Sequence, residues 1–168
     1  LVKGREFEIY CAKIFDADPG VKIKRWTPDK GISENIDVEN NGDPDFLLQI
    51  ISLENCPLVY VECKFATPWT FSNSDVKNIK WSAYYQYKRY QEIRKREGVE
   101  VLMLLGVDAP ASSPQGLYLA ELFNLKSQSD YRKDHKTNFI AVKSAEQFRV
   151  SKNSLVNDIK EFVSLEFT

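Results

Sequence analysis

The sequence has few of the residues on which several common functional sites depend. Its 168 residues include three cysteines, Cys11, Cys56 and Cys63, and one histidine, His135. Because no two cysteines form a CxxC pair, we predict neither a disulfide framework nor a zinc knuckle, and a four-cysteine iron–sulfur cluster is excluded. A single histidine in a polar segment argues against a Ser-His-Asp triad and a histidine-based metal site, so we assign His135 no role.

Long hydrophobic runs, secretory signals and nucleotide-binding motifs are missing as well. The longest apolar run, Val101 to Val107, is far too short to span a bilayer, and no signal-peptide pattern opens the chain. The cysteine usage fits a reducing compartment, so we predict a cytoplasmic protein without membrane contact. Neither a P-loop nor a GxGxxG motif is present, which leaves nucleotide hydrolysis and hydride transfer without support.

Length and charge limit the function classes further. The 23 basic and 24 acidic residues give a formal net charge of −1. A strongly basic protein that coats nucleic acid is therefore excluded, although a locally basic groove is not. The length predicts one domain over residues 1–168, with a core that needs neither disulfides nor a structural metal. Because the first residue is Leu1 and not Met, we expect a domain excised from a longer protein.

Hydrophobic periodicity predicts an α/β fold, with a central mixed β-sheet flanked by helices. Helices are expected over residues 3–15, 75–96 and 153–167. Strands are expected over residues 21–27, 45–51, 58–65, 101–107, 116–123 and 138–142, with a polar loop at 127–137. The strands at 45–51 and 58–65 read as a hairpin. Ser74 or Asp75 is the expected cap of the second helix, and Gly98 suits the position after its end.

The segment 75–96 combines positive charge with aromatic residues. It holds seven basic and two acidic residues, interleaved with one tryptophan and four tyrosines. Basic side chains contact phosphates and aromatic rings stack on bases, so this segment predicts a nucleic-acid-binding surface. Gln86 and Tyr90 lie four residues apart on one helix face, and Lys80 and Arg89 are candidate phosphate contacts. The alternative is a solvated helix whose aromatic residues only fill the core.

Two neighbouring strands carry the most informative polar residues. Along the strand at 58–65, side chains alternate, so Glu62 and Lys64 share one face while Cys63 faces the core. The hairpin places Asp45 opposite residue 62 or 64. Two carboxylates and a lysine in one cluster suit metal-assisted phosphodiester hydrolysis. The carboxylates hold Mg²⁺ (or Mn²⁺), and the lysine orients the attacking water.

These residues resemble the motif of the PD-(D/E)xK nuclease superfamily, with Pro44-Asp45 followed by Glu62-Cys63-Lys64. The resemblance implies the restriction-endonuclease-like fold, a three-layer α/β domain with a central mixed sheet. It implies that Asp45, Glu62 and the backbone carbonyl of Cys63 bind the metal and that Lys64 assists the water.

Two further segments extend the resemblance. In the first helix, the resemblance implies Glu8 as the supporting metal ligand through the family's spacing between glycine and glutamate, here counted from Gly4, whereas helix geometry alone leaves Glu6 and Glu8 equivalent. The run from Gln86 to Tyr90 resembles the QxxxY motif of the RecB-like branch, which implies that these two residues support the site or contact the substrate. DNA is the usual substrate of this family, RNA stays open, and a homodimer or a larger host protein is a compatible assembly.

Other interpretations of the same residues remain. A D/E-x-K pattern occurs four times in the chain, and only the copy at 62–64 lies in a strand-like apolar run. Glu62 and Lys64 could form a structural ion pair on a solvated sheet face, as antiparallel sheets often expose one polar face. A non-catalytic nucleic-acid-binding module of the same fold is the main alternative function, and a protein-interaction domain of a larger assembly is the third.

Overall fold

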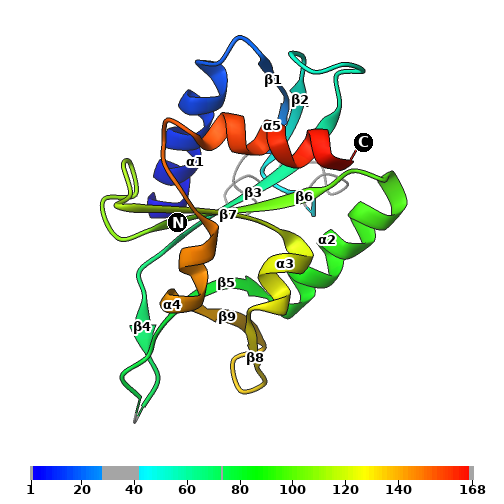
Figure 1. Ribbon diagram of the computed structural model, residues 1–168. Helices are drawn as coiled ribbons and strands as arrows, with labels where there is room; N and C mark the ends of the chain where they lie inside the picture. Colours follow the sequence, from blue (N-terminus) through cyan, green and yellow to red (C-terminus); the bar gives the residue numbers. More distant parts are fainter. Residues whose placement is uncertain (1, 28–41, 73, 167–168) are drawn as a thin grey trace.

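The computed structural model describes residues 2–27, 42–72 and 74–166 (Figure 1). The helices are α1 (Val2–Asp16), α2 (Tyr84–Glu97), α3 (Leu122–Ser127), α4 (Val142–Ala145) and α5 (Leu155–Glu166). The strands are β1 (Val21–Trp26), β2 (Phe46–Ile50), β3 (Leu58–Ala66), β4 (Trp69–Thr70), β5 (Lys77–Ala83), β6 (Val101–Val107), β7 (Gly116–Glu121), β8 (Asp130–Arg132), β9 (Thr137–Ala141) and β10 (Arg149–Val150). Among these residues, no helix is both long and apolar enough to cross a membrane.

The larger sheet has six strands in the order β1-β2-β3-β6-β7-β10. Strands β3 and β6 are parallel, and every other neighbouring pair is antiparallel. The predicted hairpin is confirmed, because β2 and β3 pair directly with Phe46 opposite Val61. Strand β3 therefore lies in the middle of the sheet, with β2 on one side and β6 on the other.

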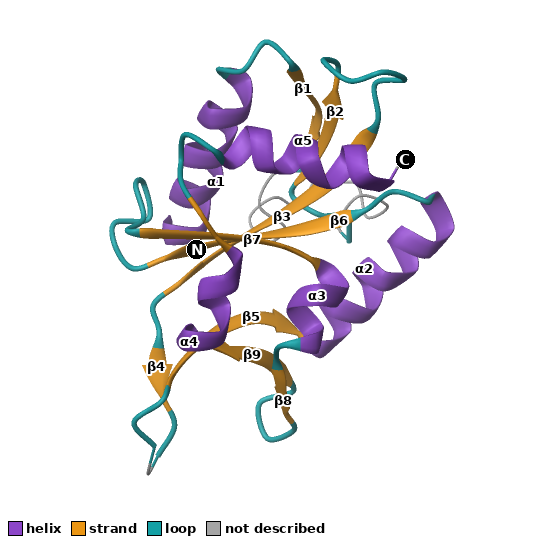
Figure 2. Cartoon of the chain, viewed as in Figure 1, coloured by secondary structure: helices purple, strands orange, loops and turns teal. Residues whose placement is uncertain are grey.

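Alternation along the strands produces two hydrophobic cores, one on each face of this sheet. The odd-numbered residues Val59, Val61 and Cys63 of β3 pack beneath α1 and α5. Tyr60 faces the other way, toward α2, α3 and a smaller sheet. Figure 2 shows α1 and α5 on one side of the large sheet and α2 and α3 on the other. Each fully buried large apolar side chain contributes about 1.5–3 kcal/mol, so both layers are held firmly against the sheet.

The predicted helix over residues 75–96 is wrong in its first half. Residues 77–83 form β5, which pairs with β9 in the smaller sheet of order β4-β5-β9-β8. Ile79 and Trp81 alternate toward the second core, the period of a strand, while the basic residues beside them mimic a helix surface. Helix α2 begins only at Tyr84, so Ser74 and Asp75 are not its cap. Its end is as predicted, with Gly98 at φ 68°.

Four smaller predictions about the C-terminal half also need correction. The strand expected over 116–123 ends at Glu121, and the next six residues form α3. The polar loop expected over 127–137 contains β8. The short strand after it is β9, displaced by one residue, and the closing helix begins at Leu155. Each error lies where long-range pairing or packing, and not local pattern, decides the structure.

The three thiols differ in accessibility, and this provides a chemical test of the fold. Cys11 and Cys63 are buried as predicted, whereas Cys56 is partly exposed in the β2–β3 turn. Burial raises the pKa of the Cys63 thiol well above its usual range, and the neighbouring Cys11 adds to the rise. We expect a disulfide reagent at pH 8 to modify Cys56 alone in the native protein and all three thiols after unfolding. Rapid native modification of Cys63 would contradict this arrangement, and mass spectrometry of peptides identifies the site.

Candidate functional site

The β2–β3 hairpin brings Asp45 against Glu62. Asp45 directly precedes β2, and its backbone N–H donates a hydrogen bond to Glu62 Oε1 at 3.1 Å. In return, the backbone N–H of Cys63 donates to Asp45 Oδ2 at 2.9 Å. The carbonyl of Asp45 also accepts a bond from the N–H of Thr27 at 2.8 Å, which ties it to the end of β1. The predicted juxtaposition of Asp45 with residue 62 is therefore confirmed.

Glu62 is a buried carboxylate with several partners. Its exposed fraction is 2%. The Tyr90 hydroxyl of α2 donates a hydrogen bond to Glu62 Oε2, and Lys64 Nζ lies 3.6 Å from the same oxygen. The alternative of an ion pair on a solvated sheet face does not describe Glu62, because α2 covers this face. A buried ionised carboxylate needs such donors, since desolvation alone would favour its neutral form.

Helix α2 supplies two residues that contact Glu62 and Lys64. Burial raises the pKa of the Tyr90 phenol well above its usual range, and the Glu62 carboxylate raises it further. The phenol therefore stays a neutral donor at physiological pH. Gln86, one turn earlier, accepts a hydrogen bond from Lys64 Nζ at 3.4 Å through its Oε1. The same oxygen accepts the N–H of Ala83 at 3.3 Å, so the start of α2 and the Lys64 side chain share one anchor.

The predicted phosphate contacts are separated by the structure. Arg89 is exposed on α2 and lies over the segment that leads into Asp45, because a Cβ placed on Gly42 would come within 2.7 Å of Arg89 Cδ. Lys80 is not on that helix. It is exposed on β5, opposite Phe139 of β9, and so belongs to the smaller sheet.

Glu8 is the glutamate of α1 that the structure buries, whereas Glu6 is exposed. The Trp26 indole N–H donates to Glu8 Oε1 at 3.3 Å, and the Arg5 guanidinium lies 4.7 Å from the Trp26 ring centroid. In the part of the chain that the structure describes, no group of three or more His, Cys, Asp or Glu side chains is arranged to hold a metal. The structure brings together the carboxylates of Asp45 and Glu62 as a candidate metal-binding pair. A metal-binding role for Glu8 stays a prediction.

Sequence reasoning missed a polar network that braces the segment before Asp45. Arg25 of β1 forms an ion pair with Asp43 at 3.0 Å and donates to the Tyr60 hydroxyl at 3.1 Å. That hydroxyl in turn donates to Glu97 Oε1 at 2.8 Å. Burial, together with Glu97, raises the pKa of Tyr60 to about 12. Alternation along β3 puts Tyr60 on the same face as Glu62, whereas nothing local in the sequence indicates Arg25.

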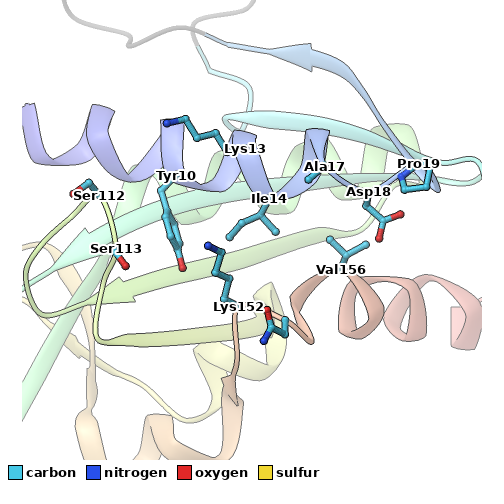
Figure 3. A pocket seen from close by; sticks show the side chains of 11 residues that line it. Tyr10, Lys13, Ile14, Ala17, Asp18, Pro19, Ser112, Ser113, Lys152 and Val156 are labelled. Atoms are coloured by element: carbon cyan, nitrogen blue, oxygen red, sulfur yellow. The ribbon is translucent and has the colours of Figure 1, made fainter.

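A cavity of about 620 Å³ lies on the other side of the large sheet (Figure 3). It is bounded by Tyr10 and Ile14 of α1, by Ser113 in the loop before β7, and by Lys152 and Val156 at the start of α5. None of the predicted site residues lines it. The carboxylate pair is thus not part of this cavity.

The hydrogen bond from Tyr90 to Glu62 gives a prediction about stability. Tyr90→Phe removes one donor from a buried carboxylate, and we expect the free energy of unfolding to fall by about 1.5–3 kcal/mol. The matched control is Tyr87→Phe one turn earlier, whose hydroxyl accepts a bond from the neutral amide of Gln91 at 3.0 Å and whose ring, which Phe retains, lies beneath Lys126. The free energy of unfolding of Tyr87→Phe should fall by less than about 1 kcal/mol. Urea unfolding monitored by circular dichroism measures both, and equal losses would show that Glu62 does not depend on Tyr90.

Comparison with known proteins adds a statement about the fold. No protein-family model matches the sequence, and no curated protein matches it either. Solved structures do match, among them that of Archaeoglobus fulgidus Hjc, a Holliday junction resolvase from an archaeal hyperthermophile. That structure has a TM-score of 0.50 and 11% sequence identity, and the match covers 89% of this chain and 91% of Hjc. The chain is therefore similar to Hjc in its architecture, and it has the restriction-endonuclease-like fold that the sequence predicted.

Proposed function

We propose that this protein is a metal-dependent nuclease of the PD-(D/E)xK type that hydrolyses phosphodiester bonds of DNA. The observation that carries the proposal is a pair of hydrogen bonds. The Asp45 N–H donates to the Glu62 carboxylate, and the Cys63 N–H donates to the Asp45 carboxylate, while Lys64 Nζ lies 3.6 Å from Glu62. The fold supports it, because Hjc, which has the same architecture, is a Holliday junction resolvase.

The donor set suits a hard divalent cation. Asp45, just before β2, and Glu62 on β3 offer carboxylate oxygens, and the Cys63 carbonyl lies between Glu62 and Lys64 in the chain. Mg²⁺ or Mn²⁺ would be held by these groups, with Glu8 in support. When bound, such a cation polarises the phosphoryl group and lowers the pKa of a water ligand.

Other residues of the chain have separate catalytic and substrate-binding roles. Lys64, with its side chain 29% exposed, is open to solvent on one side and positioned by Gln86 on the other. It orients the attacking water and stabilises negative charge that develops on the phosphate. Tyr90 keeps Glu62 in place. Arg89 and the other exposed basic residues of α2 contact the phosphates of the substrate.

A cleavage assay tests this proposal. End-labelled single-stranded, duplex and branched DNA, with an RNA control, are incubated with the protein in Mg²⁺, Mn²⁺ or EDTA. We expect cutting of at least one DNA substrate in either metal and none in EDTA. Cutting that persists in EDTA would contradict the metal requirement. Cutting of RNA alone would contradict the proposal that DNA is the substrate.

The second candidate is a non-catalytic nucleic-acid-binding module of the same fold. The observation that favours it is the lack of a three-acid metal group among the residues the structure describes. It predicts salt-dependent binding with no cutting in any metal, and the assay above separates the two functions directly.

A further inference from the structure

An aromatic cluster lies outside both hydrophobic cores. It consists of Trp69 on β4, Phe71 just after it, His135 in the β8–β9 turn and Phe139 on β9. Neighbouring ring centroids are 4.7 Å apart for Trp69 and Phe71, and 5.0 Å apart for Phe71 and Phe139. The Arg132 guanidinium lies 3.9 Å from the Phe71 centroid. None of these four rings belongs to either core of the large sheet.

Strand register places this cluster on the outer face of the smaller sheet. Trp69 pairs with Asn78, and Lys80, two residues further along β5, pairs with Phe139. Residues that pair directly in an antiparallel sheet point to the same side, as do residues two apart on a strand. Trp69, Lys80 and Phe139 therefore share one face, while Ile79, Trp81 and Ile140 fill the second core on the other.

The outer face is open to solvent and places two basic side chains, Lys80 and Arg132, on the same side as the rings. Trp69 is 39% exposed and the His135 side chain 42%. Phe139 is buried beneath them, so it supports the rings above it. Asp134 is 3.7 Å from Arg132 and 3.4 Å from His135, and Asp130 shares the face. Exposed ion pairs of this kind contribute little to stability, so a phosphate can replace the aspartate as the partner of Arg132.

The cluster is continuous with the site on β3. Trp69 follows Lys64 by five residues, and β4 begins three residues after β3 ends at Ala66. Figure 1 shows β4 leading away from the large sheet into the smaller sheet, where β5 lies next to it and β8 forms the opposite edge. A strand of nucleic acid that leaves Lys64 along the direction of β3 would reach the outer face of the smaller sheet next.

We propose that the outer face of the smaller sheet binds an unpaired stretch of the nucleic acid strand, with bases on Trp69 and His135 and phosphates on Arg132 and Lys80. This inference rests on the proposed function and names the kind of substrate that it prefers. Exposed rings interleaved with cations suit single strands, because every unstacked base offers a face to an aromatic ring. A duplex keeps its bases stacked inside and offers only phosphates to such a surface. The Arg132 guanidinium beside the Phe71 ring places a phosphate contact next to a stacking surface, so we favour nucleic acid over a protein partner.

Binding measured in EDTA tests the inference independently of cleavage. Fluorescence anisotropy compares a labelled fifteen-nucleotide oligothymidylate with a blunt duplex of equal length, at low and moderate salt. We expect Trp69→Ala and Arg132→Gln each to weaken binding of the single strand by at least about fivefold, and binding of the duplex by less than twofold.

The matched control is Tyr131→Ala. Tyr131 is 41% exposed on the same strand as Arg132 but pairs with Asn138 on the inner side, where it packs on Tyr84. This variant should bind the single strand as the wild type does. Circular dichroism confirms that each variant is folded. If Trp69→Ala does not fold, Arg132→Gln carries the test together with quenching of tryptophan fluorescence by the oligonucleotide, which Trp69→Phe should diminish.

The outcomes separate this inference from the proposed function. Unchanged single-strand binding in both folded variants, or equal loss for single strand and duplex, overturns the inference and leaves the nuclease proposal standing. Unchanged binding would show that the cluster does not contact nucleic acid, and equal loss would make it a phosphate contact common to single strand and duplex. Selective loss of single-strand binding supports the inference even if no cleavage is found in any metal, and in that case only the catalytic part of the proposed function fails.

Discussion

Lys64→Ala should abolish cleavage while leaving the fold intact. We expect the metal-dependent rate to fall by roughly 10²–10⁴-fold, the range over which a positioned proton-transfer group acts. The side chain is 29% exposed, and its contacts are the Glu62 carboxylate at 3.6 Å and the Gln86 carbonyl at 3.4 Å. Glu62 is buried but keeps the Tyr90 hydroxyl and the Asp45 N–H as donors, so we expect the free energy of unfolding to fall by about 1.5–3 kcal/mol, the contribution of one hydrogen bond to a charged group. Initial rates and thermal melts measure the two effects.

Lys95→Ala provides the matched control for this variant. Lys95 is an exposed lysine on α2, and it should lose only a small share of substrate affinity when removed. If Lys64→Ala and Lys95→Ala cleave at the same rate, Lys64 has no catalytic role. A Lys64→Ala protein that fails to fold would instead show that the residue is structural.

Asp45→Asn should remove metal binding together with cleavage. Asparagine has the shape of aspartate, and its carbonyl can still accept the N–H of Cys63, which Asp45 Oδ2 accepts at 2.9 Å. The change therefore deletes a charge and little else. Affinity for Mn²⁺, followed by electron paramagnetic resonance of the free ion, should fall by more than the roughly 10–100-fold seen when an outer-shell partner is lost. The cleavage rate should fall with it.

Asp43→Asn, two residues earlier, is the control for charge in the same segment. Asp43 pairs with Arg25 at 3.0 Å. Its loss should leave Mn²⁺ affinity within a few-fold of the wild type. An equal decrease in both variants would show that the negative charge of the segment, and not a ligand at Asp45, attracts the cation.

The core of the site was predictable because it depends on short-range geometry. A hairpin with a fixed register and the alternation of side chains were enough to place Asp45 beside Glu62 and Lys64 on the face opposite Cys63. Helical spacing was enough to put Gln86 and Tyr90 on the same side of α2, where Gln86 contacts Lys64 and Tyr90 contacts Glu62. The roles of these residues in catalysis are not tested by their positions and stay proposals.

What could not be predicted depends on contacts distant in the sequence. Strand β5 takes its conformation from pairing with β9, more than fifty residues later, and local basic residues suggested a helix instead. The burial of Glu62 follows from the packing of α2 over β3, which no pattern along β3 reveals. His135 was given no role because a lone loop histidine is usually solvated. Its place beside Trp69 and Phe139 requires the smaller sheet to form.

A crystal soaked in Mn²⁺ would test the central claim most directly, because anomalous scattering locates the ion without reference to activity. The account predicts an anomalous peak bonded to the carboxylates of Asp45 and Glu62, beside Lys64, and no such peak in a crystal of Asp45→Asn. A saturating soak that leaves this position empty, with Glu62 still held by Tyr90 and Asp45 still held by Cys63, would contradict it.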